Sequence, residues 1–151
     1  MHAANSAAAI GLPDAAFDLV RPGLALYGYH AHADLAEIAP GLAPAMTLSA
    51  PVTYVKRIAA GTSVSYGHTW TAPHDTTVAT IRCGYADGYP RLLSNRGRVR
   101  VGDALVPVAG RVCMDQLLLD VGDRTVAVGD MVDLFGPAGP TAADVAALGE
   151  S

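Results

Sequence analysis

The residues with the clearest capacity for chemistry lie in the polar segment GTSVSYGHTW, residues 61–70. Tyr66 stands there between a serine and a glycine, in a segment that separates two apolar runs, so we expect its side chain to be presented to a site. A phenol has a pKa of about 10 and transfers protons near neutral pH only where charge or hydrogen bonds favour the phenolate. Tyr66 is therefore the candidate general acid or base.

Two stretches near the start of the chain have the composition of an anion-binding corner. Residues 5–8, NSAA, offer an amide, a hydroxyl and free backbone N–H groups where a helix could begin, and such groups suit a phosphate. In VRPGLALYG, Arg21 supplies a permanent positive charge and Gly23 lets a ligand approach the backbone. Simpler interpretations stay open, because Ser6 could be an ordinary helix N-cap and Arg-Pro-Gly an ordinary turn.

Two later stretches combine several polar groups. Residues 84–91, GYADGYPR, hold an Asp-Gly turn signal with a tyrosine on each side. Tyrosines in such places usually cover the edge of a core. Residues 112–116, VCMDQ, place a thiol, a thioether, a carboxylate and an amide in sequence. Cysteine and methionine are more often packing residues than reactive ones.

Composition limits the classes of function. A formal charge of −4 argues against nucleic acid as a partner, and the run Arg91, Arg96, Arg98, Arg100, which alternates with apolar residues in RVRV, is typical of the wet face of a strand. No apolar run approaches the roughly twenty residues of a membrane span, and the first residues lack the features of a signal peptide. We therefore predict a cytoplasmic protein with no membrane partner. Two cysteines without a CxxC partner favour reduced thiols and no metal site.

The 151 residues predict one folded domain and a smaller leading part. From Met46 the pattern MTLSAPVTYVKRI places Met46, Leu48, Ala50, Val52 and Tyr54 on one face of a strand. Six further strand candidates, separated by glycine-bearing turns, are SVSYG, TTVATIRCG, GRVRVG, ALVPVAG, QLLLDVG and GDMVDLFG. No long helix intervenes, which predicts a small, mainly β, closed or nearly closed antiparallel barrel.

Helical signals are confined to two short segments of this β-rich part. YPRLLSN predicts a helical turn, and TAADVAALGE predicts a helix at the end of the chain. Thr141 and Asp144 have the spacing of a capping box at the start of that helix. The leading part, which is rich in Ala, Gly and Pro, predicts short elements and loops, with a boundary between residues 40 and 45.

Five motifs, HAANSAA, VRPGLALYG, VSYG, GYADGYPR and GRVCMDQ, follow one another in an order that strongly resembles the alanine racemase family. These pyridoxal-phosphate enzymes interconvert L- and D-alanine for the peptidoglycan of the bacterial cell wall. The resemblance runs from His2 to about Gly149. It implies that residues 1–44 are the C-terminal remnant of a cofactor-binding TIM (β/α)8 barrel. Residues 45–151 would be the C-terminal Greek-key β-barrel domain, incomplete at its end.

The resemblance also implies roles for individual residues. Tyr66 matches the catalytic tyrosine, which the family's homodimer presents to the partner subunit's active site, where it exchanges a proton with one face of the alanine Cα. Arg21 would hydrogen-bond the unprotonated pyridine nitrogen of the cofactor. The residues that match the cofactor site are Asn5, Ser6, Arg21, Gly23 and Leu24. The residues that match the substrate site and its entrance are Met114, Tyr85 and Asp115.

One departure from the family bears on activity. The family's second base is the lysine that also forms the Schiff base with the cofactor, whereas the single lysine here, Lys56 in TYVKRI, matches no catalytic position. The resemblance therefore implies a C-terminal fragment of an alanine racemase that is inactive alone and whose binding of pyridoxal phosphate is in doubt. Two alternatives stay open: a non-catalytic β-barrel module for dimerisation or binding, and a racemase acting on serine or another small amino acid.

Overall fold

The structure is a computed structural model that describes residues 1–149. The chain forms two compact units, one of residues 1–46 and one that begins at Thr47. No helix within the described residues is long and apolar enough to cross a lipid bilayer.

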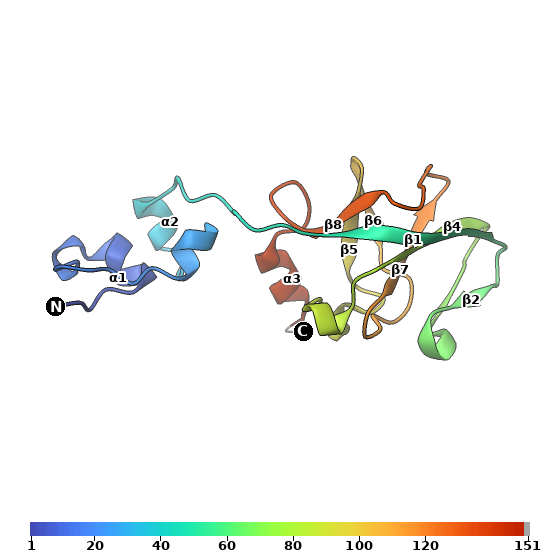
Figure 1. The fold of residues 1–151 in the computed structure, drawn as a ribbon, viewed down its shortest axis with the longest axis horizontal. Coiled ribbons are helices and arrows are strands. Elements are labelled where there is room, and N and C mark those ends of the chain that lie inside the picture. Colours follow the sequence, from blue (N-terminus) through green and yellow to red (C-terminus); the bar gives the residue numbers. More distant parts are fainter. Residues whose placement is uncertain (150–151) are drawn as a thin grey trace. The chain divides into compact units, whose positions relative to one another are not determined.

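Short helices and loops make up the first unit (Figure 1). Its elements are the helices α1 (Ser6–Gly11) and α2 (Leu35–Ile38) and the 3-10 turns η1 (Pro13–Ala15) and η2 (Leu24–Tyr27). Ala4 is the one fully buried apolar residue among residues 1–46. Large apolar side chains are instead exposed, namely Leu12, Phe17, Leu19, Val20, Leu24, Leu26, Tyr27 and Ile38. This unit therefore has no apolar core of its own.

The start of α1 corrects the interpretation of Ser6 as a helix cap. Asn5 is the N-cap, and its Oδ1 accepts a hydrogen bond from the Ala8 N–H at 3.1 Å. Because asparagine already satisfies this helix end, the buried Ser6 hydroxyl is free for another role. It accepts hydrogen bonds from the N–H groups of Gly23 at 2.8 Å and Ala25 at 3.3 Å.

The second unit is a six-stranded antiparallel barrel, as predicted (Figure 1). Its strands run in the order β6-β5-β8-β1-β4-β7. A bridge between Val108 and Leu119 links the two edges of the sheet, and the Ala109 N–H donates to the Leu118 carbonyl at 2.8 Å. The strands are β1 (Leu48–Ile58), β4 (Thr76–Ile81), β5 (Arg98–Val101), β6 (Ala104–Pro107), β7 (Leu117–Gly122) and β8 (Met131–Phe135).

Shorter elements connect these strands. A hairpin of β2 (Ser63–Val64) and β3 (Trp70–Thr71) carries the 3-10 turn η3 (Tyr66–His68), so only the first part of the predicted SVSYG strand is a strand. The turns η4 (Tyr85–Asp87) and η5 (Arg91–Leu93) follow β4, and the helix α3 (Ala142–Gly149) follows β8. The predicted capping box of α3 is confirmed, because the Thr141 N–H donates to Asp144 Oδ2 and the Asp144 N–H donates to Thr141 Oγ1. The Thr141 N–H and the Thr141 hydroxyl both donate to Asp144 Oδ2, and these two hydrogen bonds lower the pKa of the Asp144 carboxyl.

The prediction of which side chains of β1 share one face is right for the first part of the strand and wrong for Tyr54. Ala50 and Val52 are buried, but Tyr54 is 57% exposed and Met46, which precedes the strand, is also exposed. The register against β4 shifts between Val52 and Tyr54. A β-bulge adds one residue on one strand, and a shift of one residue moves side chains to the opposite face. The bulge therefore turns Tyr54 outwards.

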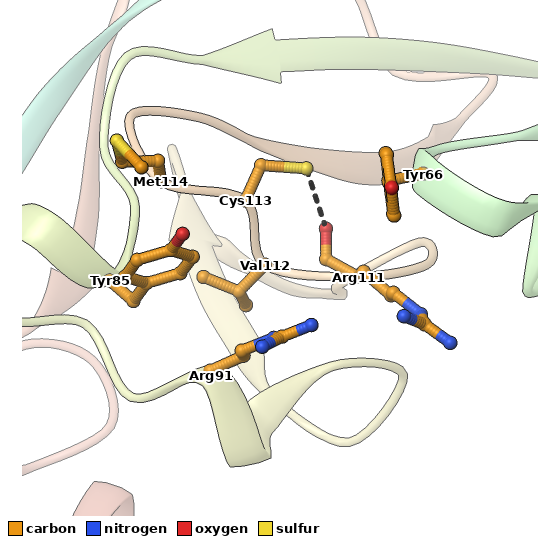
Figure 2. A pocket seen from close by; sticks show the side chains of 7 residues that line it. All are labelled: Tyr66, Tyr85, Arg91, Arg111, Val112, Cys113 and Met114. Carbon is orange, nitrogen blue, oxygen red and sulfur yellow. Dashed lines mark hydrogen bonds between the residues drawn. The ribbon is translucent and has the colours of Figure 1, made fainter.

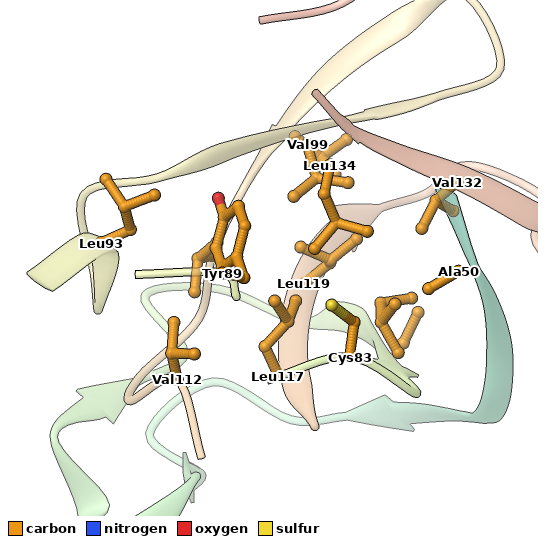
Figure 3. Packing of buried hydrophobic residues seen from close by; sticks show 14 of the residues in the cluster. Ala50, Cys83, Tyr89, Leu93, Val99, Val112, Leu117, Leu119, Val132 and Leu134 are labelled. Carbon is orange, nitrogen blue, oxygen red and sulfur yellow. The ribbon is translucent and has the colours of Figure 1, made fainter. Parts of the chain in front are cut away.

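Side chains from all six strands fill the barrel, and Figure 3 shows part of this cluster. The alternation of buried and half-buried residues along β7 is that of a strand with one face towards a core. Tyr89 is fully buried, and its hydroxyl has no hydrogen-bond partner within residues 1–149. A Cβ at Gly97 would lie 2.6 Å from that hydroxyl oxygen. Glycine at this position is therefore what makes room for the Tyr89 ring.

We expect the barrel to lose stability between about pH 9 and about pH 12. Burial, together with the Asp87 carboxylate, raises the pKa of Cys83 to about 11, and burial beside Cys83 raises the pKa of Tyr89 to about 12. The folded state thus holds these two protons to higher pH than the unfolded chain does. The stabilisation that these two protons provide is complete below about pH 9. As pH rises through the folded pKa of each group, the free energy of unfolding falls by roughly 2 to 3 kcal/mol.

Urea unfolding at a series of pH values measures this loss. Tyr89→Phe should flatten the curve between about pH 10 and 12, and at pH 7 it should leave stability equal or slightly higher, because the hydroxyl that it removes makes no hydrogen bond. Tyr54→Phe is the control, since Tyr54 is exposed, and it should leave the curve unchanged. An equal slope in wild type and Tyr89→Phe would contradict the prediction.

Candidate active site

Tyr66 occupies the turn η3, between the two strands of the β2–β3 hairpin, and its side chain is 73% exposed. The backbone on either side is unusual, because Ser65 and His68 have positive φ values of 67° and 50°. Gly67 has a φ of 76°, and a Cβ added at this position would lie 3.7 Å from the Arg111 guanidinium. The turn therefore lies directly against the segment that contains Arg111.

Tyr85 and Met114 are held together by backbone contacts. The N–H groups of Tyr85 and Ala86 donate to the carbonyls of Cys113 and Met114, both at 2.9 Å. This approach requires glycine at position 84, where a Cβ would lie 2.3 Å from the Cys113 carbonyl oxygen. Asp87 Oδ2 accepts the Gly84 N–H at 2.9 Å and so closes the turn η4.

These segments surround a cavity of about 270 Å³ (Figure 2). Three of the four residues predicted for catalysis or substrate binding line it: Tyr66, Tyr85 and Met114. Asp115 is exposed and follows Met114 in the chain, but it does not line the cavity. The complete lining is Tyr66, Tyr85, Arg91, Arg111, Val112, Cys113 and Met114.

Two arginines give the cavity its charge. The Arg91 guanidinium stands over the Tyr85 ring, 5.9 Å from the ring centre, which is the geometry of a cation–π contact. Arg111 lies on the Tyr66 side of the cavity in Figure 2, and no carboxylate is among the lining residues. Guanidinium groups bind carboxylates and phosphates through paired N–H donors. The cavity is therefore suited to a small anion.

Cys113 contributes a thiol to the same cavity, and its Sγ lies 3.7 Å from the Arg111 carbonyl oxygen. Cys83 is buried in the barrel, and both cysteines are free thiols. Residues 1–149 contain no cluster of three or more His, Cys, Asp or Glu side chains that could hold a metal ion.

A second group of predicted residues meets in the first unit. The Ser6 hydroxyl bonds to the backbone of Gly23 and Ala25, which joins the start of α1 to the start of η2 and brings Leu24 to the same corner. The Arg21 N–H donates to the Ala4 carbonyl at 2.8 Å, and its side chain reaches the Ala3 carbonyl at 3.4 Å. Because the Ser6 oxygen accepts two N–H groups, its own proton is left to donate to an anion.

Comparison with known proteins decides the family. A model described as "Alanine racemase, C-terminal domain" matches residues 45–151, and one described as "Alanine racemase, N-terminal domain" matches residues 1–31. The chain belongs to the alanine racemase family.

Individual racemases support the assignment. The alanine racemase of Salinispora arenicola is 54% identical over 135 residues, which cover 89% of this chain and 36% of that protein. That of Frankia casuarinae is 50% identical, and the match covers 98% of this chain and 40% of the relative. The chain thus spans about two fifths of the length of these racemases.

Solved structures of alanine racemases have the same fold. The enzyme from Streptomyces lavendulae aligns over 99% of this chain and 40% of its own, with 44% identity and a TM-score of 0.86. The Clostridium difficile enzyme, solved as a complex with cycloserine, aligns over the same shares with 36% identity and a TM-score of 0.90.

Arg91 and Arg111 are the charged residues of this cavity that sequence reasoning missed. Arg91 had been grouped with the arginines of the β5 strand, but it lies in η5 and faces the cavity. Arg111 stands within the motif GRVCMDQ, and the available signal was its place three residues before Met114. Neither position could be assigned from spacing alone, because both depend on how three loops fold against one another.

Proposed function

We propose that these residues form the C-terminal part of a cytoplasmic, homodimeric, pyridoxal-phosphate-dependent alanine racemase that supplies D-alanine for peptidoglycan. The observation that carries the proposal is the meeting of Tyr66, Tyr85 and Met114, from three separate loops, at one positively charged cavity. Each had been assigned to catalysis or substrate binding from a different motif. Membership of the family and the racemase relatives support the same conclusion.

The donors of the first unit fit pyridoxal phosphate. The Ser6 hydroxyl and the backbone at Gly23 and Leu24 would hold the phosphate, with Asn5 shaping the loop through its cap on α1. Arg21 would donate to the pyridine nitrogen and, because a guanidinium does not release its proton, keep that nitrogen unprotonated. When bound, the cofactor supplies the electron sink that makes the alanine α-proton acidic.

The residues of the cavity would handle the amino acid. Arg91 and Arg111 would attract its carboxylate, while Tyr85 and Met114 would limit its size. Asp115, which follows Met114 in the chain, would stand at the entrance. The Tyr66 hydroxyl exchanges a proton with one face of the alanine Cα in the partner subunit's active site. A racemase needs a second base on the opposite face of Cα.

In the family this second base is the lysine that also forms the Schiff base with the cofactor. Lys56, the single lysine, lies on β1 and contributes to a different cavity, together with Tyr54, Val64 and Leu118. We therefore expect residues 1–151 to be inactive alone. The lysine must come from a part of a racemase that this sequence does not contain.

Racemisation assays with and without a complete cofactor-binding barrel test the proposal. Purified residues 1–151 with added pyridoxal phosphate should show no conversion of L- to D-alanine. A chimera in which this chain replaces the matched segment of the Streptomyces coelicolor racemase, to which it is 44% identical, should be active. Conversion by the chain alone would refute the account of the missing lysine. A folded, cofactor-loaded chimera without activity would point to a non-catalytic module, and activity on serine alone to a different substrate.

A further inference from the structure

Ser65 has a backbone conformation that serine rarely adopts. Its φ of 67° and ψ of 169° fall in a region that is occupied almost entirely by glycine. On backbone grounds glycine would be favoured here, as it is at the neighbouring Gly67. The presence of serine indicates that the hydroxyl does something that outweighs the strain.

The hydroxyl of Ser65 holds both backbone groups of one residue. Its oxygen accepts the Arg111 N–H at 2.9 Å, and its proton is donated to the Arg111 carbonyl at 3.1 Å. Gly110 makes this approach possible, because a Cβ there would lie 2.3 Å from the Ser65 Cβ. Ser65 and Gly110 are therefore a sterically matched pair.

Asn95 makes a second connection on the other side of Tyr66. Its side-chain oxygen accepts the Gly110 N–H at 2.7 Å, and its Nδ2 donates to the Thr69 carbonyl at 3.1 Å. Asn95 also has a positive φ, of 59°. The loop at residues 110 and 111 is thus bonded to Ser65 on one side of the catalytic turn and, through Asn95, to Thr69 on the other.

The bonds from Ser65 and Asn95 to residues 110 and 111 are called the clamp here, and the exposure of Tyr66 explains why they are needed. With 73% of the side chain exposed, few contacts within this chain fix the ring, so the backbone must set its position. We propose that Ser65 is a positioning residue, which fixes the Tyr66 turn against the loop that carries Arg111 and Met114. The catalytic meaning of this clamp rests on the proposed function; the clamp itself does not.

Two substitutions separate the hydroxyl from the backbone conformation, and a third serves as the control. Ser65→Gly removes the hydroxyl and relieves the strain, and Ser65→Ala removes the hydroxyl but keeps the strain. Ser63→Ala is the matched control, because Ser63 is in the same hairpin and its hydroxyl bonds to Thr71 Oγ1, at 2.9 Å, and not to the loop at residues 110 and 111. If the backbone alone mattered, Ser65→Gly would equal or exceed the wild type in every measurement.

NMR on residues 1–151 tests the clamp without any need for activity. In Ser65→Gly we expect the Arg111 amide to exchange about tenfold faster or more. The backbone order parameter of Tyr66 should fall from about 0.85 towards about 0.6. The Ser63→Ala control should change neither. An Arg111 amide and a Tyr66 order parameter that stay at wild-type values in Ser65→Gly would overturn the proposal.

Kinetics of the racemase chimera test the consequence for catalysis. Misplacing a catalytic group lowers kcat more than substrate affinity, so Ser65→Gly should lower kcat by about 10- to 100-fold while KM for alanine changes by less than about threefold. Its melting temperature should stay near that of the wild type. Faster exchange with an unchanged kcat would overturn the positioning role. An inactive wild-type chimera would refute the proposed function instead, and the NMR result would still decide whether the clamp exists.

Discussion

Tyr66→Phe in the racemase chimera should lower kcat for alanine racemisation by about 10³-fold, within the range that a positioned general acid or base contributes. The substitution removes one oxygen from an exposed side chain, so the fold and melting temperature should not change. Racemisation of L-alanine and of D-alanine should be slowed equally, because each reaction includes one proton transfer at Tyr66. Coupled assays started from L-alanine and from D-alanine measure this.

The variant should keep one partial reaction. A base on the opposite face of Cα, supplied by the rest of the chimera, can still exchange the α-proton of one enantiomer with solvent. In D₂O, NMR should therefore show exchange in one enantiomer of alanine and almost none in the other. The control is Tyr54→Phe, since Tyr54 is also an exposed tyrosine but lies on β1, and it should be fully active. Near-normal racemisation by Tyr66→Phe would remove Tyr66 from the mechanism.

Gly84→Ala should destabilise the barrel by about 3 kcal/mol or more, which is at the upper end for overpacking. The backbone of Gly84, with φ −147° and ψ −161°, is extended, so alanine meets no strain of its own. The added Cβ would, however, lie 2.3 Å from the Cys113 carbonyl oxygen and 2.5 Å from the Met114 carbonyl. All of these neighbours are backbone atoms. The loop must move, and the two hydrogen bonds from Tyr85 and Ala86 must stretch or break.

Urea unfolding, followed by the far-ultraviolet signal of the barrel, gives this loss of stability. Gly102→Ala is the control, because nothing lies within 4 Å of its added Cβ and only its φ of 61° is unfavourable. It should cost about 1 kcal/mol. If Gly84→Ala costs no more than Gly102→Ala, the close approach of the two loops is absent in solution.

Local pattern in the sequence was sufficient to predict the barrel. The strands β4, β5, β6, β7 and β8 are short segments rich in apolar and β-branched residues between glycine-bearing turns. Residues 141–144 have the side chains that cap a helix. Pairing was not predictable in this way. The exposure of Tyr54 depends on a bulge that exists only in relation to β4. Its position cannot be derived from β1 alone.

The site residues that belong to a motif with a family resemblance could be predicted. Those that reach the site only through contacts between separate loops could not. Tyr66, Tyr85 and Met114 were predicted from motifs, and the structure brings them together. The roles of Arg91 and Arg111 depend on contacts between segments that lie far apart in the chain, such as the bond from Ser65 to Arg111. Asn5, and not Ser6, caps α1. Both side chains can cap a helix, and only the bond from the Gly23 N–H to the Ser6 hydroxyl distinguishes them.

The pairing of β1 with β8 has a consequence for how the protein is made. Leu48 pairs with Phe135 and Ser49 with Asp133, so the first strand of the barrel depends on one of the last. At roughly 5 to 20 residues per second, a ribosome needs on the order of 4 to 15 seconds to complete β8 after β1 has been synthesised. During that interval one edge of β1 has no partner, and unpaired edges promote aggregation. Slower translation or a higher temperature should therefore reduce the soluble yield before either affects the finished barrel.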